Sequence, residues 1–117
     1  AQGFARAGAN VSIISRSADK VASAVAQLQA DGAQAFGASA DVRQPEAVQQ
    51  ALRAAADRFG PIDVLVSGAA GNFLASALDL SPNAFKTVVD IDLMGSFHVA
   101  RFAHPHLRQP GACVIQI

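Results

Sequence analysis

Residues 60–71 read Gly-Pro-Ile-Asp-Val-Leu-Val-Ser-Gly-Ala-Ala-Gly, a helix break followed by an apolar run and then by a turn of small residues. The run at 62–66 is almost continuously apolar, as in parallel strands that helices cover on both faces. Parallel strands cannot be joined by a tight hairpin, so such a strand has to alternate with helices along the chain. This stretch therefore predicts an α/β fold.

The same alternation extends towards the N-terminus. Residues 11–15 form a β-branched run, and residues 33–38 form a weaker one, since alanine and glycine are poor strand formers. Apolar residues at helical spacing predict helices over 18–31 and 45–59. Two strand–helix pairs therefore precede the run at 62–66.

A long helix is expected after the small-residue turn. Ser81 followed by Pro82 has the pattern of an N-cap with proline in the first turn, and apolar spacing continues to Leu107. Pro105 is expected to end or bend this helix. Repeated strand–helix alternation is typical of right-handed βαβ units, so we expect a doubly wound, Rossmann-like parallel sheet that is only partial.

Both ends of the chain fall within expected elements. Residues 1–8 have the pattern of a helix closed by a glycine, and residues 111–117 have that of a turn followed by a buried strand. Domains usually begin and end at exposed polar segments. We therefore expect residues 1–117 to be the central part of one dinucleotide-binding domain, truncated at both ends.

Composition argues against several classes of function. Nine Lys and Arg balance nine Asp and Glu, so there is no basic field for nucleic acid or for an anionic membrane surface. Apolar runs are much shorter than the roughly 20 residues of a membrane span. The single cysteine, Cys113, indicates a reducing compartment and is expected to be buried. His98, His104 and His106 have no neighbouring acidic or cysteine cluster, so no metal site is expected.

Ligands of open α/β sheets bind beyond the carboxyl ends of the strands. After the first run, Arg16 can bind a 2′-phosphate through two hydrogen bonds, and Ser15 and Ser17 can donate others, which favours NADP. Arg16 can alternatively be a solvated residue that opens a helix. After the second run, Asp41 can accept from an adenine amino group while Val42 packs on the ring. Asp41 can equally terminate the strand or cap the following helix.

The third turn combines small residues with two larger side chains. Ala69, Ala70 and Gly71 allow a ribose and a nicotinamide to approach the backbone closely, although small residues also serve strand-to-helix packing. Asn72 and Phe73 follow at the mouth of the expected cleft. Together they place a hydrogen-bonding amide beside an apolar wall that suits an acyl chain.

The chain resembles the short-chain dehydrogenase/reductase family in the order of its motifs. These are Arg16, Asp41-Val42, the small-residue turn and a helix carrying Asp-Leu-Met-Gly-Ser-Phe at 92–97. The resemblance covers essentially all 117 residues. Within the family, Gly-Ala-Ala-Gly-Asn-Phe at 68–73 and Leu-Ser-Pro-Asn-Ala-Phe-Lys-Thr at 80–87 are most similar to the 2,4-dienoyl-CoA reductases, particularly the peroxisomal type.

The resemblance implies reduction of a 2,4-dienoyl-CoA thioester to a 3-enoyl-CoA by NADPH, in the degradation of unsaturated fatty acids. It implies that Arg16 and Asp41 contact NADP, and that Asn72 is a catalytic residue that donates to the thioester oxygen. The residues that it places along the acyl-CoA substrate are Arg43, Phe73 and Ser81.

The resemblance also implies a homotetramer formed through long helices. Phe97, Val99 and Phe102 could supply such an interface, or they could be core residues. The compartment implied is the peroxisome in a eukaryote and the cytoplasm in a bacterium.

The sequence also departs from the family pattern. Ser67 and Gly68 stand where members usually carry one or two asparagines, and Asp92 stands where many carry the asparagine of a proton relay. Asp90 and Asp92 do not share a helix face, so no paired-acid site is expected. The 117 residues contain no tyrosine and no glycine-rich phosphate turn, so we expect them to be inactive alone. The alternatives are a short-chain alcohol or 3-oxoacyl reductase and a non-catalytic nucleotide-binding remnant.

Overall fold

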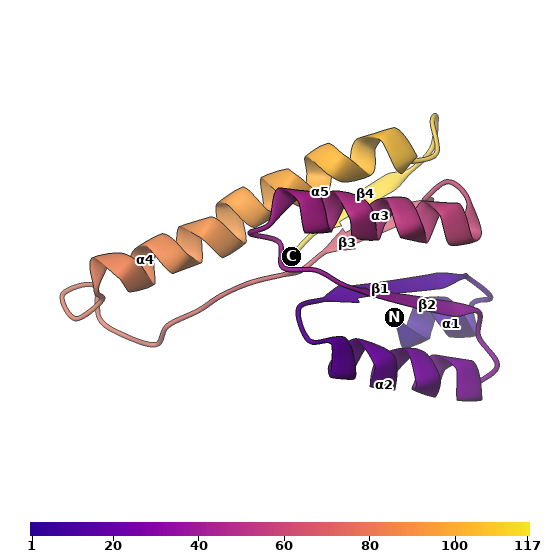
Figure 1. Ribbon diagram of the computed structural model, residues 1–117, viewed down its shortest axis with the longest axis horizontal. Helices are drawn as coiled ribbons and strands as arrows, with labels where there is room; N and C mark the ends of the chain where they lie inside the picture. Colours follow the sequence, from indigo (N-terminus) through magenta and orange to yellow (C-terminus); the bar gives the residue numbers. More distant parts are fainter.

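Two pairs of parallel strands form the scaffold of the computed structural model, which describes residues 1–117 (Figure 1). Strand β1 (Val11–Ser15) pairs with β2 (Ala35–Ser39), and β3 (Val64–Ser67) pairs with β4 (Cys113–Gln116). Helices connect the strands of each pair, as parallel pairing requires. The α/β fold with Rossmann-like parallel strands is therefore confirmed.

The first three helices have the local signals that the sequence predicts. Helix α1 (Gln2–Arg6) precedes β1, α2 (Ala18–Ala30) joins β1 to β2, and α3 (Pro45–Phe59) joins β2 to β3. Helices α2 and α3 end just before Gly32 and Gly60, whose φ angles of +84° and +85° favour glycine. None of the helices has both the length and the hydropathy needed to cross a bilayer.

The long helix near the C-terminus is divided into four segments. They are α4 (Pro82–Val88), the π-helical η1 (Val89–Met94), α5 (Gly95–Ala103) and the 3₁₀-helical η2 (His104–His106). The cap at the start of α4 is confirmed, because the Ser81 hydroxyl accepts from the Ala84 N–H at 3.1 Å. The π-helical segment is an unpredicted feature, and such segments often mark functional sites.

Helix α3 packs against residues from both strand pairs. Its Val48 and Leu52 form a cluster with the fully buried Ala103 of α5, and Ile14 of β1 and Leu65 of β3 pack against that cluster. Figure 1 shows α3 and α5 running side by side, and they are in contact. No ladder joins β1 to β3, so side-chain packing under α3 holds the two pairs together.

The sequence analysis leaves Phe97, Val99 and Phe102 as either core or interface residues, and two of them lie against this cluster. Val99 and Phe102 pack on it, which makes them core residues in this structure. The side chain of Phe97 is 52% exposed and belongs to the surface of α5.

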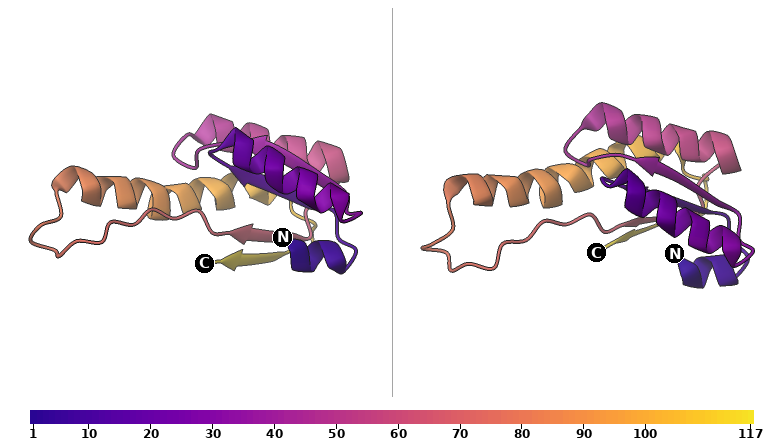
Figure 2. Two further views of the ribbon diagram at one scale, coloured as in Figure 1. Left: turned by 90° about the horizontal axis from the view of Figure 1, so that it is seen from below. Right: turned by 60° about the horizontal axis from the view of Figure 1, so that its bottom comes forward.

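The second strand pair is more exposed than the sequence predicts. Val64 and Val66 of β3 are 41% and 45% exposed, and all four residues of β4 are exposed. The predictions of a strand at 62–66 buried on both faces, of a buried strand near the C-terminus and of a buried thiol at Cys113 are therefore wrong here. The physical reason is that helices cover this pair from one face (Figure 2).

Gly37 of β2 lies under α2, where an added Cβ would be 2.5 Å from a Val21 methyl group and 2.8 Å from one of Val25. We expect Gly37→Ala to lower the free energy of unfolding by about 1–3 kcal/mol, because these short side chains cannot move aside cheaply. Urea denaturation of the protein measures this change. The control is Gly3→Ala in α1, where nothing lies within 4 Å of the added atom. Equal free energies for the two variants would contradict the packing described for β2.

Candidate functional site

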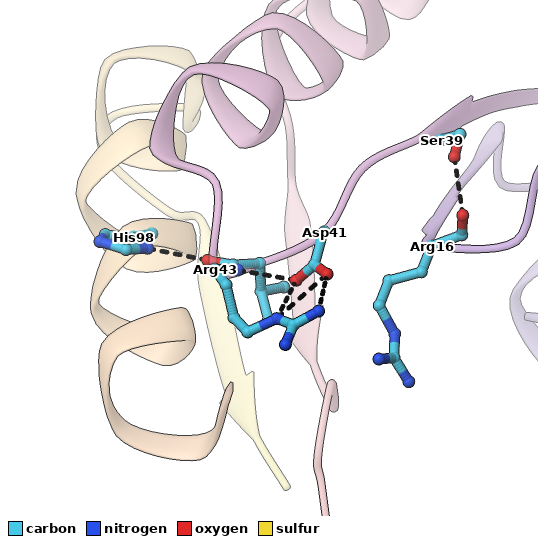
Figure 3. A network of polar contacts seen from close by, with 6 residues as sticks. Arg16, Ser39, Asp41, Arg43 and His98 are labelled. Carbon is cyan, nitrogen blue, oxygen red and sulfur yellow. Dashed lines mark hydrogen bonds and ion pairs between the residues drawn. The ribbon is translucent and has the colours of Figure 1, made fainter. Parts of the chain in front are cut away.

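The carboxyl ends of β1 and β2 bring Arg16 close to Asp41. The Ser39 hydroxyl donates to the Arg16 carbonyl oxygen at 3.0 Å, which ties the two strand ends together. The guanidinium of Arg16 takes no part in the four ion pairs of the structure, and Figure 3 shows it extended beside the Asp41 carboxylate. The pKa of Asp41 is lowered mainly by hydrogen bonds from Arg43, and the positive charge of Arg16 adds a smaller effect in the same direction. Arg16 is therefore a free cation at the carboxyl-end edge of β1 and β2, where the sequence analysis expects a 2′-phosphate.

Asp41 and Arg43 bind each other at this edge. The Arg43 Nη2 lies 2.5 Å from Asp41 Oδ2, and Arg43 Nε lies 3.0 and 3.1 Å from the two carboxylate oxygens. The hydrogen bonds from the Arg43 side chain are the main cause of the lowered Asp41 pKa, which burial opposes, and they raise the pKa of Arg43. The two residues that the sequence analysis assigns to cofactor and substrate thus form one unit, and their separate roles stay predictions.

Val42, between these two residues, faces helix α5. A Cβ at Gly95 would lie 2.6 Å from the Val42 Cγ2 atom, so only glycine allows this approach. The carbonyl oxygen of Val42 lies 2.8 Å from Nδ1 of His98, also on α5 (Figure 3). The turn after β2 is therefore anchored on α5 by its backbone and by its side chain. That Val42 also packs on an adenine ring stays a prediction.

The turn after β3 is held by the π-helical segment η1. The Gly71 N–H donates to Asp92 Oδ1 at 2.7 Å, and a Cβ at Gly71 would lie 2.7 Å from Ile91 Cδ1. Asp90 points elsewhere and pairs with Lys86. The sequence analysis names Asp92 for its position in the family pattern, but it does not predict this contact, because the regular helix expected there does not show which carboxylate faces the turn.

Small and exposed side chains follow Ser67 in this turn. Ala69, Ala70 and Asn72 are exposed, and Phe73 is 47% exposed. That a ribose and a nicotinamide approach the backbone of this turn stays a prediction. Asn72 lies at the surface.

A glutamine bridges the end of β3 to helix α5. Nε2 of Gln116 in β4 donates to the Ser67 hydroxyl at 3.2 Å and to the Ser96 hydroxyl at 2.8 Å. Ser96 in turn donates to the Asp92 carbonyl oxygen at 2.5 Å. Ser67 is 6% exposed, so this chain of hydrogen bonds provides a buried hydroxyl with the partner it requires. The network fixes the end of β3 relative to the helix that holds its turn.

Not all predicted site residues come together. Ser15 and Ser17 flank Arg16, and the Ser17 hydroxyl also caps α2 by accepting from the Lys20 N–H at 3.4 Å. Ser81 caps α4, which Figure 1 places at the far end of the molecule from β1 and β2.

No group of three or more histidine, cysteine or acidic side chains is placed to hold a metal ion.

The sequence and the fold both define the protein class. The family model for short chain dehydrogenases matches residues 1–117, so the chain belongs to the short chain dehydrogenase family. The chain is 42% identical to a peroxisomal 2,4-dienoyl-CoA reductase of Arabidopsis thaliana, over 91% of this chain and 36% of that protein. It is 45% identical to the Rattus norvegicus protein of the same name, over 97% of this chain and 40% of that protein. The resemblance identified from the sequence is confirmed.

Solved structures show the same fold. A 3-ketoacyl-ACP reductase from Sinorhizobium meliloti 1021 superposes with a TM-score of 0.91 at 26% identity, covering 98% of this chain and 46% of that one. An actinorhodin polyketide ketoreductase with NADPH superposes with a TM-score of 0.81 at 26% identity, covering 86% of this chain and 38% of that one. The chain spans about two fifths of the length of the two reductases named above.

The Asp41–Arg43 pair predicts a measurable titration. Arg43→Gln should raise the pKa of Asp41 towards its ordinary value of 3.8, because the bonds that favour the carboxylate are lost. The folded-state pKa of the wild type is depressed, so the pair stabilises the fold above about pH 4 and loses this effect as pH falls through the lowered pKa. Carboxyl-carbon NMR titration measures the pKa of Asp41 in the wild type and in the variant.

The matched control is Arg108→Gln. Arg108 forms the corresponding ion pair with Asp63, whose pKa it lowers. This variant should raise the pKa of Asp63 and leave that of Asp41 unchanged. An Asp41 pKa that does not move in Arg43→Gln would show that the pair is absent in solution.

Proposed function

We propose that this chain carries the cofactor edge and part of the substrate site of a reductase that uses NADPH to convert 2,4-dienoyl-CoA thioesters to 3-enoyl-CoA. The observation that carries the proposal is the free Arg16 guanidinium beside the paired Asp41, at the carboxyl ends of parallel strands. The chain's 42% and 45% identity to 2,4-dienoyl-CoA reductases supports this choice of substrate. The 26% identity to a 3-ketoacyl-ACP reductase gives the carbonyl-reductase alternative weaker support.

The charges at this edge favour NADPH over NADH. Arg43 neutralises Asp41, so the carboxylate does not repel a phosphate as an unpaired acid would. Arg16 is left with its guanidinium free to bind the 2′-phosphate through two hydrogen bonds. Ser15 and Ser17 can donate further hydrogen bonds, since capping α2 uses only the acceptor capacity of Ser17.

The turn after β3 suits the reacting end of the cofactor. When bound there, NADPH supplies the hydride. Ala69, Ala70 and Gly71 let its nicotinamide approach the backbone, which Asp92 holds in place through the Gly71 N–H. Asn72 follows directly, and its amide N–H donates to the thioester oxygen as negative charge develops there.

The substrate has its own set of residues in this proposal. Phe73 provides an apolar wall for the acyl chain, and Ser81 lines the site further along the loop. Arg43 lines the substrate site while it holds Asp41. The complete substrate site includes residues beyond this chain, because the curated relatives are more than twice as long.

The proposal extends to the domain, the oligomeric state and the compartment of the enzyme. Residues 1–117 are the central part of one reductase domain, and the phosphate-binding turn and the proton donor come from the rest of it, so this chain alone is inactive. The enzyme acts as a homotetramer through the exposed face of α4 and α5, which includes Phe85 and Phe97. Its compartment follows the relatives named as peroxisomal if the source is a eukaryote, and is the cytoplasm in a bacterium.

Removal of the Arg16 guanidinium tests the cofactor. In the full-length enzyme, Arg16→Ala should raise the KM for NADPH by about 10- to 100-fold and leave the KM for NADH nearly unchanged, because only the 2′-phosphate contact is lost. Steady-state oxidation of each cofactor gives both values. The control is Arg53→Ala on α3, where the arginine is 74% exposed. A wild-type enzyme that prefers NADH would refute the cofactor assignment.

Removal of the Asn72 amide tests the catalytic role. Asn72→Ala should lower kcat on a 2,4-dienoyl-CoA by about 100-fold, because the developing oxyanion loses a hydrogen-bond donor. The control is Asn10→Ala, at the opposite ends of the strands, which should retain full turnover. If Asn72→Ala turns over at the wild-type rate, Asn72 does not stabilise the oxyanion.

A further inference from the structure

His98 contacts the turn that carries Asp41 and Arg43 from a helix 56 positions further along the chain. Its Nδ1 lies 2.8 Å from the Val42 carbonyl oxygen, and the ring is partly buried. A carbonyl oxygen can only accept a hydrogen bond, so Nδ1 carries the hydrogen and donates it. The imidazole therefore acts here as a fixed donor to backbone.

The peptide group that His98 holds is also held at its other end. The Val42 carbonyl and the Arg43 N–H belong to one planar unit. That N–H donates to Asp41 Oδ1 at 3.0 Å, and the same oxygen also accepts from Arg43 Nε. Because the unit is rigid, fixing its carbonyl fixes the direction of its N–H. His98 thereby sets where the Asp41 carboxylate lies.

The packing of α5 makes this contact specific. Gly95 and His98 are three positions apart and so lie on one face of the helix. Val42 reaches that face because Gly95 has no side chain, since a Cβ there would be 2.6 Å from Val42 Cγ2. The close approach at Gly95 brings the Val42 carbonyl within reach of the imidazole one turn later.

We propose that His98 is a positioning residue for the cofactor, which it orients through the Val42–Arg43 peptide group and the Asp41 carboxylate. This inference rests on the proposed function, since Asp41 is there a cofactor contact. His98 itself touches neither the cofactor nor the reacting atoms. Its loss should therefore weaken NADPH binding and leave the chemical step intact.

The test uses the full-length enzyme with three variants. His98→Leu removes the donor, and His98→Asn retains an N–H at the δ position. His104→Leu is the matched control, because His104 is exposed on η2. Calorimetric titration gives the Kd for NADPH, steady-state kinetics gives kcat at saturating NADPH, and thermal unfolding gives Tm.

We expect His98→Leu to raise the Kd for NADPH by about threefold to tenfold, as the loss of one hydrogen bond implies, with kcat within about twofold of the wild type. His98→Asn should restore the Kd, and His104→Leu should leave it unchanged. An unchanged Kd in His98→Leu overturns the inference, as does a loss of kcat at constant Kd or a failure of asparagine to rescue. If His98→Leu does not fold, His98→Gln, which moves the donor one bond outward, replaces it with the same expected rise.

Failure of this inference differs from failure of the proposed function. If the wild-type enzyme binds no NADPH, both are overturned. If the wild type binds NADPH and His98→Leu binds it equally well, the inference about His98 alone is overturned.

Discussion

One helical face holds both turns of the candidate site, and the geometry of the rest depends on it. Ile91, Gly95 and His98 follow one another at spacings of four and three, so they lie along one side of η1 and α5. Ile91 packs on Gly71, with Asp92 bonding the Gly71 N–H, while Gly95 and His98 receive the turn at Val42. The ends of β2 and β3 are thus set relative to each other, although β1 and β3 share no ladder.

Electrostatics at the edge follows from the same arrangement. The peptide group fixed on α5 directs the Asp41 carboxylate to Arg43, and their mutual hydrogen bonds neutralise both charges locally. Arg16 remains as the unpaired charge of the three, and the proposed binding of the 2′-phosphate rests on this unpaired charge. The turn after β3 carries no charge from Ser67 to Phe73, which suits the uncharged nicotinamide and thioester in the proposed reaction.

Much of the fold could be predicted from the sequence, because the decisive signals are local. The run at 11–15 and the helix at 45–59 have the predicted bounds, and the predicted cap at Ser81 forms. Exposure could not be predicted in the same way: Cys113 lies in an apolar run, yet whether a strand is buried depends on what covers it. The contacts of Asp92 and His98 were also missed, since they join positions 21 and 56 residues apart and depend on the π-helical turn and on Gly95.

The central claim is that the two turns form one nucleotide site held by one helical face. Hydrogen exchange in the full-length enzyme, measured with and without NADPH, tests it most directly. The Arg43 amide, bonded to Asp41, and the Gly71 amide, bonded to Asp92, report on the two turns. The account predicts that NADPH slows exchange at both amides over the same range of concentration. Slowing at one turn alone, or at neither, would contradict it.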